Sequence, residues 1–277
     1  MIEVNGNKYK LLLLDTNALS NLLKDSKKWI KYIDSKFSIA KTVICYSAFT
    51  LCEITRRKDL FVKYIELFSI FPSAILDGFD SIYKKELENY DKSNSKISPI
   101  VILPYALRDD TIKSPQEKLR KVIEISGFHS KSDYWINSRK SILDNIISLK
   151  DNFKSSGSKF IKKEIEEFVY YSTLQQIILR NMNFANNIVK VRKEEMDVYR
   201  FPSIISTSYV VFYKFYPDKR KPVASDIIDI IISSLLPYVD YFITEGHLNE
   251  IVNRMQKIHS YLPDLKSYSI RDIKKYI

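Results

Sequence analysis

The sequence contains few of the residues that build the commonest enzyme sites: 2 cysteines, 3 histidines and 5 glycines among 277 residues. Cys45 is expected to end a strand and Cys52 to lie on the next helix, which keeps their Cα atoms outside disulfide range and indicates reduced thiols. His129, His247 and His259 lack the spacing of zinc ligands. The glycines form neither a phosphate-binding loop nor a nucleophile elbow. These absences argue against zinc enzymes, P-loop nucleotide-binding proteins and serine hydrolases.

Long hydrophobic runs are also missing. The opening segment MIEVNGNKYK has no apolar secretory core, and the most apolar run, Ile227 to Val239, contains Asp229 and Pro237. The sequence therefore predicts a cytoplasmic protein without a membrane partner.

The chain is rich in apolar residues and in positive charge. Apolar residues make up 45% and aromatic residues 13%, which is ample for a folded core. Lysine and arginine number 44 against 33 acidic residues, giving a formal charge of +11. A polyanion, and nucleic acid first of all, is the partner that this charge favours. The alternative is that the lysine content only reflects a biased genome.

The stretch LLLLDTNALSNLLK, residues 11–24, joins a buried run to an amphipathic helix. Lys10 to Leu14 is short and uniformly apolar at its end, as strands covered on both faces are. A helix follows, with Thr16 or Asn17 as the expected N-cap. Asp15 then lies at the carboxyl end of a strand, where open α/β sheets bind their ligands. In the alternative, Asp15 merely caps the helix.

The same design recurs twice. Thr42 to Tyr46 is a β-rich run followed by Ser47, a predicted N-cap, and by a helix that carries Glu53 about two turns in. Near the other end of the chain, Tyr241 to Thr244 is a short apolar strand followed directly by Glu245. Acids thus follow three separate predicted strands.

Two further acids share one face of a predicted helix. Asp226 and Asp229 are three residues apart in the segment SDIIDIII, so both can face the same cleft. In the alternative, Ser225 caps the helix, Asp226 complements its dipole and Asp229 is partly exposed. An acid among isoleucines makes that alternative less satisfactory, because an unpaired buried carboxylate is costly.

The middle of the chain differs in character. Residues 72–200 have long helical patterns at Trp135 to Leu149 and Phe160 to Met182, joined by the flexible segment DNFKSSGSK. This segment is interpreted as a mostly helical insertion. The pattern of Ser203 to Tyr216 then favours another helix, despite its β-branched residues.

Taken together, the motifs LLLLDTNAL, SAFTLCEI, SDIIDIIISSLLPYVDYFIT and FITEGHL resemble those of the PIN-domain nucleases, metal-dependent enzymes that mostly cut RNA. The resemblance covers about the first 70 and the last 60 residues. It implies an α/β protein with a three-layer α/β/α PIN-like fold around a central parallel sheet. The chain would be one domain, 1–277, with core segments of about 1–71 and 201–277 and the helical insertion at 72–200.

The resemblance also assigns roles. The implied catalytic metal ligands for Mg²⁺ or Mn²⁺ are Asp15, Glu53, Asp226 and Glu245, with Asp229 as an outer contact. The family usually has aspartate where this chain has Glu245. Asn17, Ser20 and Thr244 match polar residues around the first and last ligands. The candidate substrate contacts are Asn17, Ser20, Arg56, Arg57, Thr244 and His247. For Arg57 the alternative is an ion pair with Glu53.

Carboxylates brought together from distant positions suit a hard divalent ion, which can activate water and neutralise a phosphodiester. The sequence therefore predicts a Mg²⁺- or Mn²⁺-dependent endoribonuclease, of the kind used as a toxin or in host defence. An inhibitory antitoxin protein and an oligomeric state are open expectations. The rival functions are a catalytically silent PIN-like module that binds RNA or protein, and a structure-specific DNA nuclease.

Overall fold

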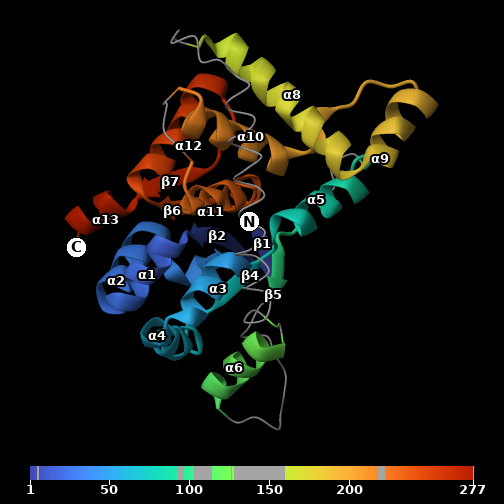
Figure 1. Ribbon diagram of the computed structural model, residues 1–277. Coiled ribbons are helices and arrows are strands. Elements are labelled where there is room, and N and C mark those ends of the chain that lie inside the picture. Colours follow the sequence, from blue (N-terminus) through green and yellow to red (C-terminus); the bar gives the residue numbers. More distant parts are fainter. Residues whose placement is uncertain are drawn as a thin grey trace.

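A central sheet of seven strands organises the computed structural model (Figure 1), which describes residues 1–4, 6–92, 97–102, 114–125, 127, 160–217 and 222–276. Six strands lie in the order β5-β4-β3-β2-β6-β7, and β1 pairs with β2 from outside this path. Their bounds are β1 Ile2–Val4, β2 Asn7–Leu14, β3 Thr42–Ser47, β4 Ser73–Leu76, β5 Ile100–Ile102, β6 Tyr241–Thr244 and β7 Lys266–Ser269. Pairing is parallel except at β1 and β5.

The strand order reverses at β2. The chain runs outward from β2 to β3 and β4, and later returns to the other side of β2 with β6 and then β7. Leu14 pairs with Ile243 in the parallel register of β2 and β6. Where two neighbouring strands connect in opposite directions, a crevice forms beyond their carboxyl ends, and this is where such sheets bind ligands. This rule places the expected ligand site of the sheet between Asp15 and Glu245, and that region is called the crevice below.

The four leucines of β2 alternate between two cores and are fully buried. Leu11 and Leu13 face a layer of helices from the second half of the chain, whereas Leu12 and Leu14 face a layer mainly from the first half, with one helix from the end of the chain. The first layer consists of α8 Lys162–Arg180, α10 Pro202–Phe215, α11 Ala224–Ser233 and α12 Gly246–His259. The second consists of α1 Thr16–Lys24, α2 Ser26–Phe37, α3 Ala48–Arg56, α4 Lys58–Phe68, α6 Pro115–Ile125 and α13 Ile270–Tyr276. The expected three-layer α/β/α architecture is confirmed.

A smaller core lies beside the first layer, where α5 Phe79–Glu88 meets α8 and α9 Met182–Asn186. Phe201 is fully buried there against Tyr83 and Tyr90. Short helical turns complete the chain: η1 Ile39–Lys41, η3 Asn187–Val191, η4 Val198–Arg200 and η5 Leu236–Tyr238. Figure 1 shows α8 and α9 projecting beyond the sheet.

The predicted insertion at 72–200 begins too early. Both β4 and β5 lie within that range and belong to the sheet, with β4 parallel to β3. β4 has only four residues, and a short apolar run next to a helix gives no distinct periodicity. The predicted helix at Phe160 to Met182 is observed as α8, whereas the one at Trp135 to Leu149 lies outside the described residues.

The helix starts correct two local expectations. Asp15, and not Thr16 or Asn17, is the N-cap of α1, since its side chain accepts the backbone N–H of Ala18. The predicted N-cap Ser47 is confirmed, with its hydroxyl accepting the N–H of Thr50. Helix α11 begins at Ala224 and its N-cap is Val223, so the cap predicted at 225 lies two residues too late. Within the described residues, no helix is both long and apolar enough to cross a membrane.

Candidate functional site

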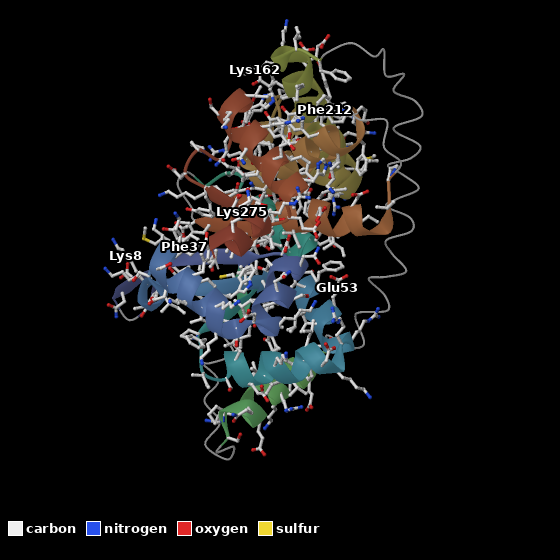
Figure 2. All side chains as sticks on the ribbon, turned by 90° about the vertical axis from the view of Figure 1, so that its left-hand side faces the viewer. Lys8, Phe37, Glu53, Lys162, Phe212 and Lys275 are labelled. Carbon is white, nitrogen blue, oxygen red and sulfur yellow. The ribbon has the colours of Figure 1, made fainter. Side chains whose placement is uncertain are left out.

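The carboxyl ends of the parallel strands form one edge of the sheet, and the predicted acids follow three of them. Figure 2 shows Lys8, at the start of β2, and Phe37, before β3, on one side of the molecule and Glu53 on the other. Asp15 directly follows β2, Glu245 follows β6, and Glu53 lies on the helix after β3. The edge thus has polar groups from elements that are far apart in sequence.

Asp15 is the most buried of the predicted acids at the end of a strand, with 4% of its surface exposed. Its Oδ1 accepts the N–H of Ala18 at 2.6 Å, and its Oδ2 accepts the hydroxyl of Thr244 at 2.5 Å and the N–H of Glu245 at 3.2 Å. These donors are all neutral. Burial raises the pKa of Asp15 to about 7, the hydrogen bond from Thr244 opposes that rise, and the nearby charge of Asp229 adds to it.

Glu245 lies at the mouth of the same crevice. Its carboxylate accepts a hydrogen bond from Asn17 Nδ2 at 2.5 Å, and both side chains are exposed. Glu245 has an extended backbone at the N-cap of α12, which directs the following helix start toward the edge. His247, in the first turn of α12, is exposed, and its charge lowers the pKa of Asp229. Asn17, Glu245 and His247 are therefore the solvent-facing groups of this crevice.

Lys214 on α10 binds the two acids of α11. Its Nζ lies 2.9 Å from Asp226 Oδ1 and 2.6 Å from Asp229 Oδ2, and its side chain is 2% exposed. The second oxygen of Asp226 accepts the N–H of Val223 at 2.8 Å. Burial raises the pKa of Asp229, and the ammonium of Lys214 is the main opposing influence. Sequence reasoning missed Lys214, although a lysine inside the apolar run YVVFYKFY is a signal of a buried ionic partner.

The other predicted residues are less closely gathered. Glu53 is partly buried on α3, and Arg56 and Arg57 are exposed at the end of that helix. Arg57 pairs with Asp59, with 3.4 Å between Nη2 and Oδ2. Ser20 is buried on α1, 8% exposed, and so does not face solvent.

Two groups at this edge were not foreseen. Arg271 of α13 lies over the start of α12, where a Cβ added to Gly246 would meet its guanidinium at 3.7 Å. That distance is an ordinary van der Waals contact, so the guanidinium lies next to the backbone beside Glu245 without requiring glycine at 246. Asp77, at the end of β4, is buried and forms an ion pair with Lys85.

A divalent ion such as Mg²⁺ needs several oxygen ligands, and the acids of the crevice are the side chains that could supply them. Carboxylate oxygens are the ligands that Mg²⁺ and Mn²⁺ prefer, so the chemistry of Asp15, Asp229 and Glu245 fits. In the described residues, however, no three acidic, histidine or cysteine side chains lie close enough together to hold a metal. The position of Lys214 accounts for part of this, because its ammonium already lies between Asp226 and Asp229.

The hydroxyl of Thr244 is expected to tune the acidity of Asp15. Thr244→Val keeps the shape of the side chain and removes its hydrogen bond to the carboxylate, so the pKa of Asp15 should rise above that of the native protein. A carboxyl-detected NMR titration would measure it. The matched control is Thr16→Val, whose hydroxyl contacts Thr50 at 3.4 Å and not Asp15. Equal pKa values in all three proteins would contradict this role of Thr244.

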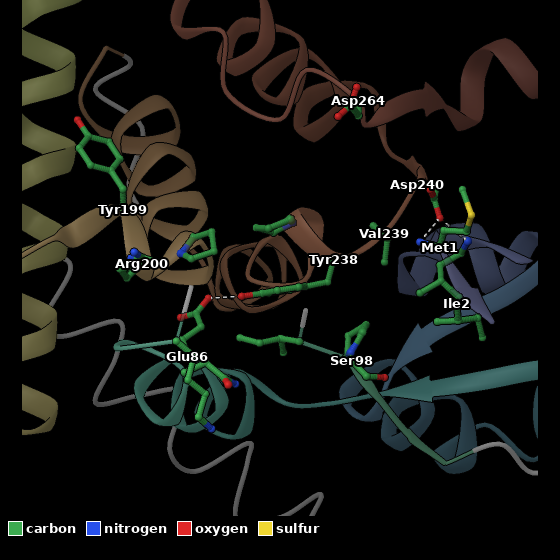
Figure 3. Close-up of a pocket in the computed structure, with 17 residues that line it drawn as sticks. Met1, Ile2, Glu86, Ser98, Tyr199, Arg200, Tyr238, Val239, Asp240 and Asp264 are labelled. Carbon is green, nitrogen blue, oxygen red and sulfur yellow. Dashed lines mark hydrogen bonds and ion pairs between the residues drawn. The ribbon is translucent and has the colours of Figure 1, made fainter. Parts of the chain in front are cut away.

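A separate cavity of about 770 Å³ lies beside β1 and the segment that leads into β6 (Figure 3). Glu86, Tyr238 and Asp240 are among its lining residues, and Figure 3 shows Glu86 and Tyr238 joined by a hydrogen bond. None of the residues predicted for the site lines this cavity. The candidate site is therefore the crevice beyond β2 and β6.

Comparison with known proteins finds no relative of this chain. Neither a family model, nor a curated protein, nor a solved structure matches the chain. The residues of the crevice and the motifs in the sequence are consequently the features that bear on function.

Proposed function

We propose that this chain is a divalent-metal-dependent endoribonuclease of the PIN-like type, with Mg²⁺ or Mn²⁺ bound in the crevice between β2 and β6. The observation that carries the proposal is Asp15. This buried carboxylate lies at the point where the strand order reverses, and in the described part of the chain only neutral groups donate to it. The charge of another acid, Asp229, adds to the rise in its pKa. Such a group is stabilised as a carboxylate by binding a cation.

The residues of the crevice would have different roles in metal binding and in proton transfer. Thr244 and the start of α1 orient Asp15, so that the carboxylate does not have to reorganise when a cation binds. Asp15 and Glu245 would hold a Mg²⁺ or Mn²⁺ ion, which would supply an activated water and neutralise charge on the phosphodiester. Asn17 donates a hydrogen bond to the carboxylate of Glu245 at the mouth of the crevice. In that position the carboxylate of Glu245 can accept a proton from water.

RNA is the proposed substrate because of charge and exposure. The chain has a formal charge of +11, and three exposed arginines can contact a phosphate backbone: Arg271 beside the start of α12, and Arg56 and Arg57 at the end of α3. Such contacts position a nucleic acid without reading its sequence. A DNA substrate satisfies the same chemistry, so labelled RNA and DNA belong in one assay. An acidic inhibitory protein of the antitoxin type would be drawn to the same arginines.

The function is tested by cleavage of labelled RNA with Mn²⁺, comparing the native chain with Asp229→Asn. Asp229 is partly exposed, and its negative charge, which reaches Asp15, would attract a divalent cation to the crevice, so its loss should slow cleavage by roughly 100-fold. Glu250→Gln is the control, because Glu250 is an exposed acid on α12 that forms an ion pair with Arg254 of the same helix. Equal rates for Asp229→Asn and the native chain would contradict the proposal.

One observation favours the rival, a catalytically silent module that binds RNA or protein. Lys214 neutralises Asp226 and Asp229, and the described acids do not form a ready metal site. A silent module should retain labelled RNA in a gel-shift assay and leave it intact with Mn²⁺. Cleavage of DNA with intact RNA would instead identify a DNA nuclease.

A further inference from the structure

Lys214 is an unusual residue for its surroundings. It lies on α10 between aromatic residues, in the run YVVFYKFY, and only 2% of its side chain is exposed. Removing an ammonium from water is costly unless charged partners replace the lost hydration. The two carboxylates of α11 are those partners, and they come from a helix that packs against α10.

The geometry around its Nζ resembles that of a bound cation. Asp226 and Asp229 are one helical turn apart, and each directs one carboxylate oxygen at the same nitrogen, at 2.9 and 2.6 Å. The other oxygen of Asp226 is used by the N–H of Val223, which fixes the orientation of that carboxylate. Two carboxylates held in this way would converge on whatever positive charge lies between them.

We propose that the ammonium of Lys214 occupies a divalent-cation position between Asp226 and Asp229. The ammonium would take the place of one divalent ion. The acids of the crevice would then bind one metal ion fewer than they could bind without Lys214. The remaining position would be at Asp15 and Glu245, whose carboxylates accept hydrogen bonds from uncharged groups: the amide of Asn17, the hydroxyl of Thr244 and a backbone N–H. This inference deepens the proposed nuclease and rests on it for its role in the reaction, in which Lys214 acts as a positioning residue.

The test counts Mn²⁺ ions bound per chain by calorimetry and by electron paramagnetic resonance of free Mn²⁺. Lys214→Met removes the ammonium and keeps the length of the apolar stem. It should bind one more Mn²⁺ ion than the native chain, and Mn²⁺ should raise its melting temperature more. Lys214→Met,Asp226→Asn should lose the additional ion, because only one carboxylate of the pair remains.

Lys85→Met is the matched control. Lys85 also binds a buried acid at the same edge, but its partner is the single carboxylate of Asp77. Removing it should therefore leave the number of bound Mn²⁺ ions unchanged. If Lys214→Met does not fold, Lys214→Gln takes its place, since it can still donate a hydrogen bond to the pair.

The outcomes separate this inference from the proposed function. An unchanged Mn²⁺ count on replacing Lys214 overturns the inference, whatever the activity of the native chain. A native chain that binds no Mn²⁺ and cuts no RNA overturns the nuclease, while a gain of one ion in Lys214→Met still supports the assignment of Lys214. Bound Mn²⁺ with cleavage in the native chain and one further ion in the variant supports both.

Discussion

Asp15→Asn is expected to lower Mn²⁺-dependent cleavage of RNA by roughly 1,000-fold, which corresponds to about 4 kcal/mol of lost transition-state stabilisation. Asparagine can still accept the N–H of Ala18 and cap α1, so the fold should persist. What disappears is the negative charge at the reversal of strand order. Rates measured under single-turnover conditions, with RNA and enzyme fixed, would show the loss. A cleavage rate within a few-fold of the native rate would remove Asp15 from the site.

The same substitution should stabilise the metal-free protein. Folding raises the pKa of Asp15 from 3.8 to about 7. The protonated carboxyl therefore stabilises the folded protein at low pH, and this contribution to the free energy of unfolding is lost as the pH rises through 7. At pH 8 Asp15→Asn should therefore unfold with a free energy higher by up to about 4 kcal/mol, a difference that should vanish toward pH 4. Urea unfolding at both pH values, with a chelator present, measures it.

Asp77→Asn provides the matched comparison. Asp77 is also a buried acid at the carboxyl end of a strand, but it has a cationic partner in Lys85. Its replacement should destabilise the chain, because Lys85 loses its ion pair, and should leave RNA cleavage intact. Asp15 and Asp77 thus predict opposite effects on stability and on activity. A chain in which both substitutions behaved alike would refute the distinction between them.

Glu86→Ala is expected to destabilise the fold by about 4 kcal/mol at pH 6. Glu86 is 1% exposed and accepts hydrogen bonds from the N–H of Ser203 at 2.7 Å, from its hydroxyl at 2.6 Å, and from the hydroxyl of Tyr238. It thereby joins α5 to the start of α10 and to η5, next to the cavity in Figure 3. Alanine leaves three buried or partly buried donors without this acceptor, and each such loss costs free energy.

The pH dependence of Glu86 identifies the cause of that loss. Burial raises its pKa from 4.5 to about 7, so its contribution to stability is full below pH 4.5 and declines as the pH rises through 7. The difference between the native chain and Glu86→Ala should shrink accordingly. Glu88→Ala is the control, since Glu88 is an exposed neighbour that lies 3.9 Å from Lys84. Guanidinium unfolding of the three proteins would decide, and equal stability of both variants would contradict this role.

Much of the sheet could be predicted because its signals are local. The run of leucines before Asp15 and the strand Tyr241–Thr244 were recognised from apolar runs that end at a polar residue. The alternative interpretation of Asp15 as a helix cap is confirmed, because one oxygen of its carboxylate accepts the N–H of Ala18. The other oxygen accepts the hydroxyl of Thr244. One side chain can do both, so capping does not argue against a site.

The features that sequence reasoning missed depend on tertiary contacts. β7 has a half-polar pattern, KSYS, which by itself reads as a loop, and it becomes a strand by pairing with β6. The contact of Lys214 with Asp226 and Asp229 requires knowing how α10 packs on α11. No pattern within either segment carries that information. The expected roles of Glu53 and of the exposed arginines stay predictions.

The separation of Asp15 and Thr244 along the chain affects when the crevice can exist. These two residues are 229 positions apart, and β2 gains β6 as its neighbour only when nearly all of the described chain is available. During synthesis a ribosome-bound segment that stops before β6 holds Asp15 with an open strand edge and no hydroxyl from Thr244. The contact of Asp15 with Thr244 can therefore form only after β6 has been synthesised, so the crevice is assembled late in the life of the growing chain.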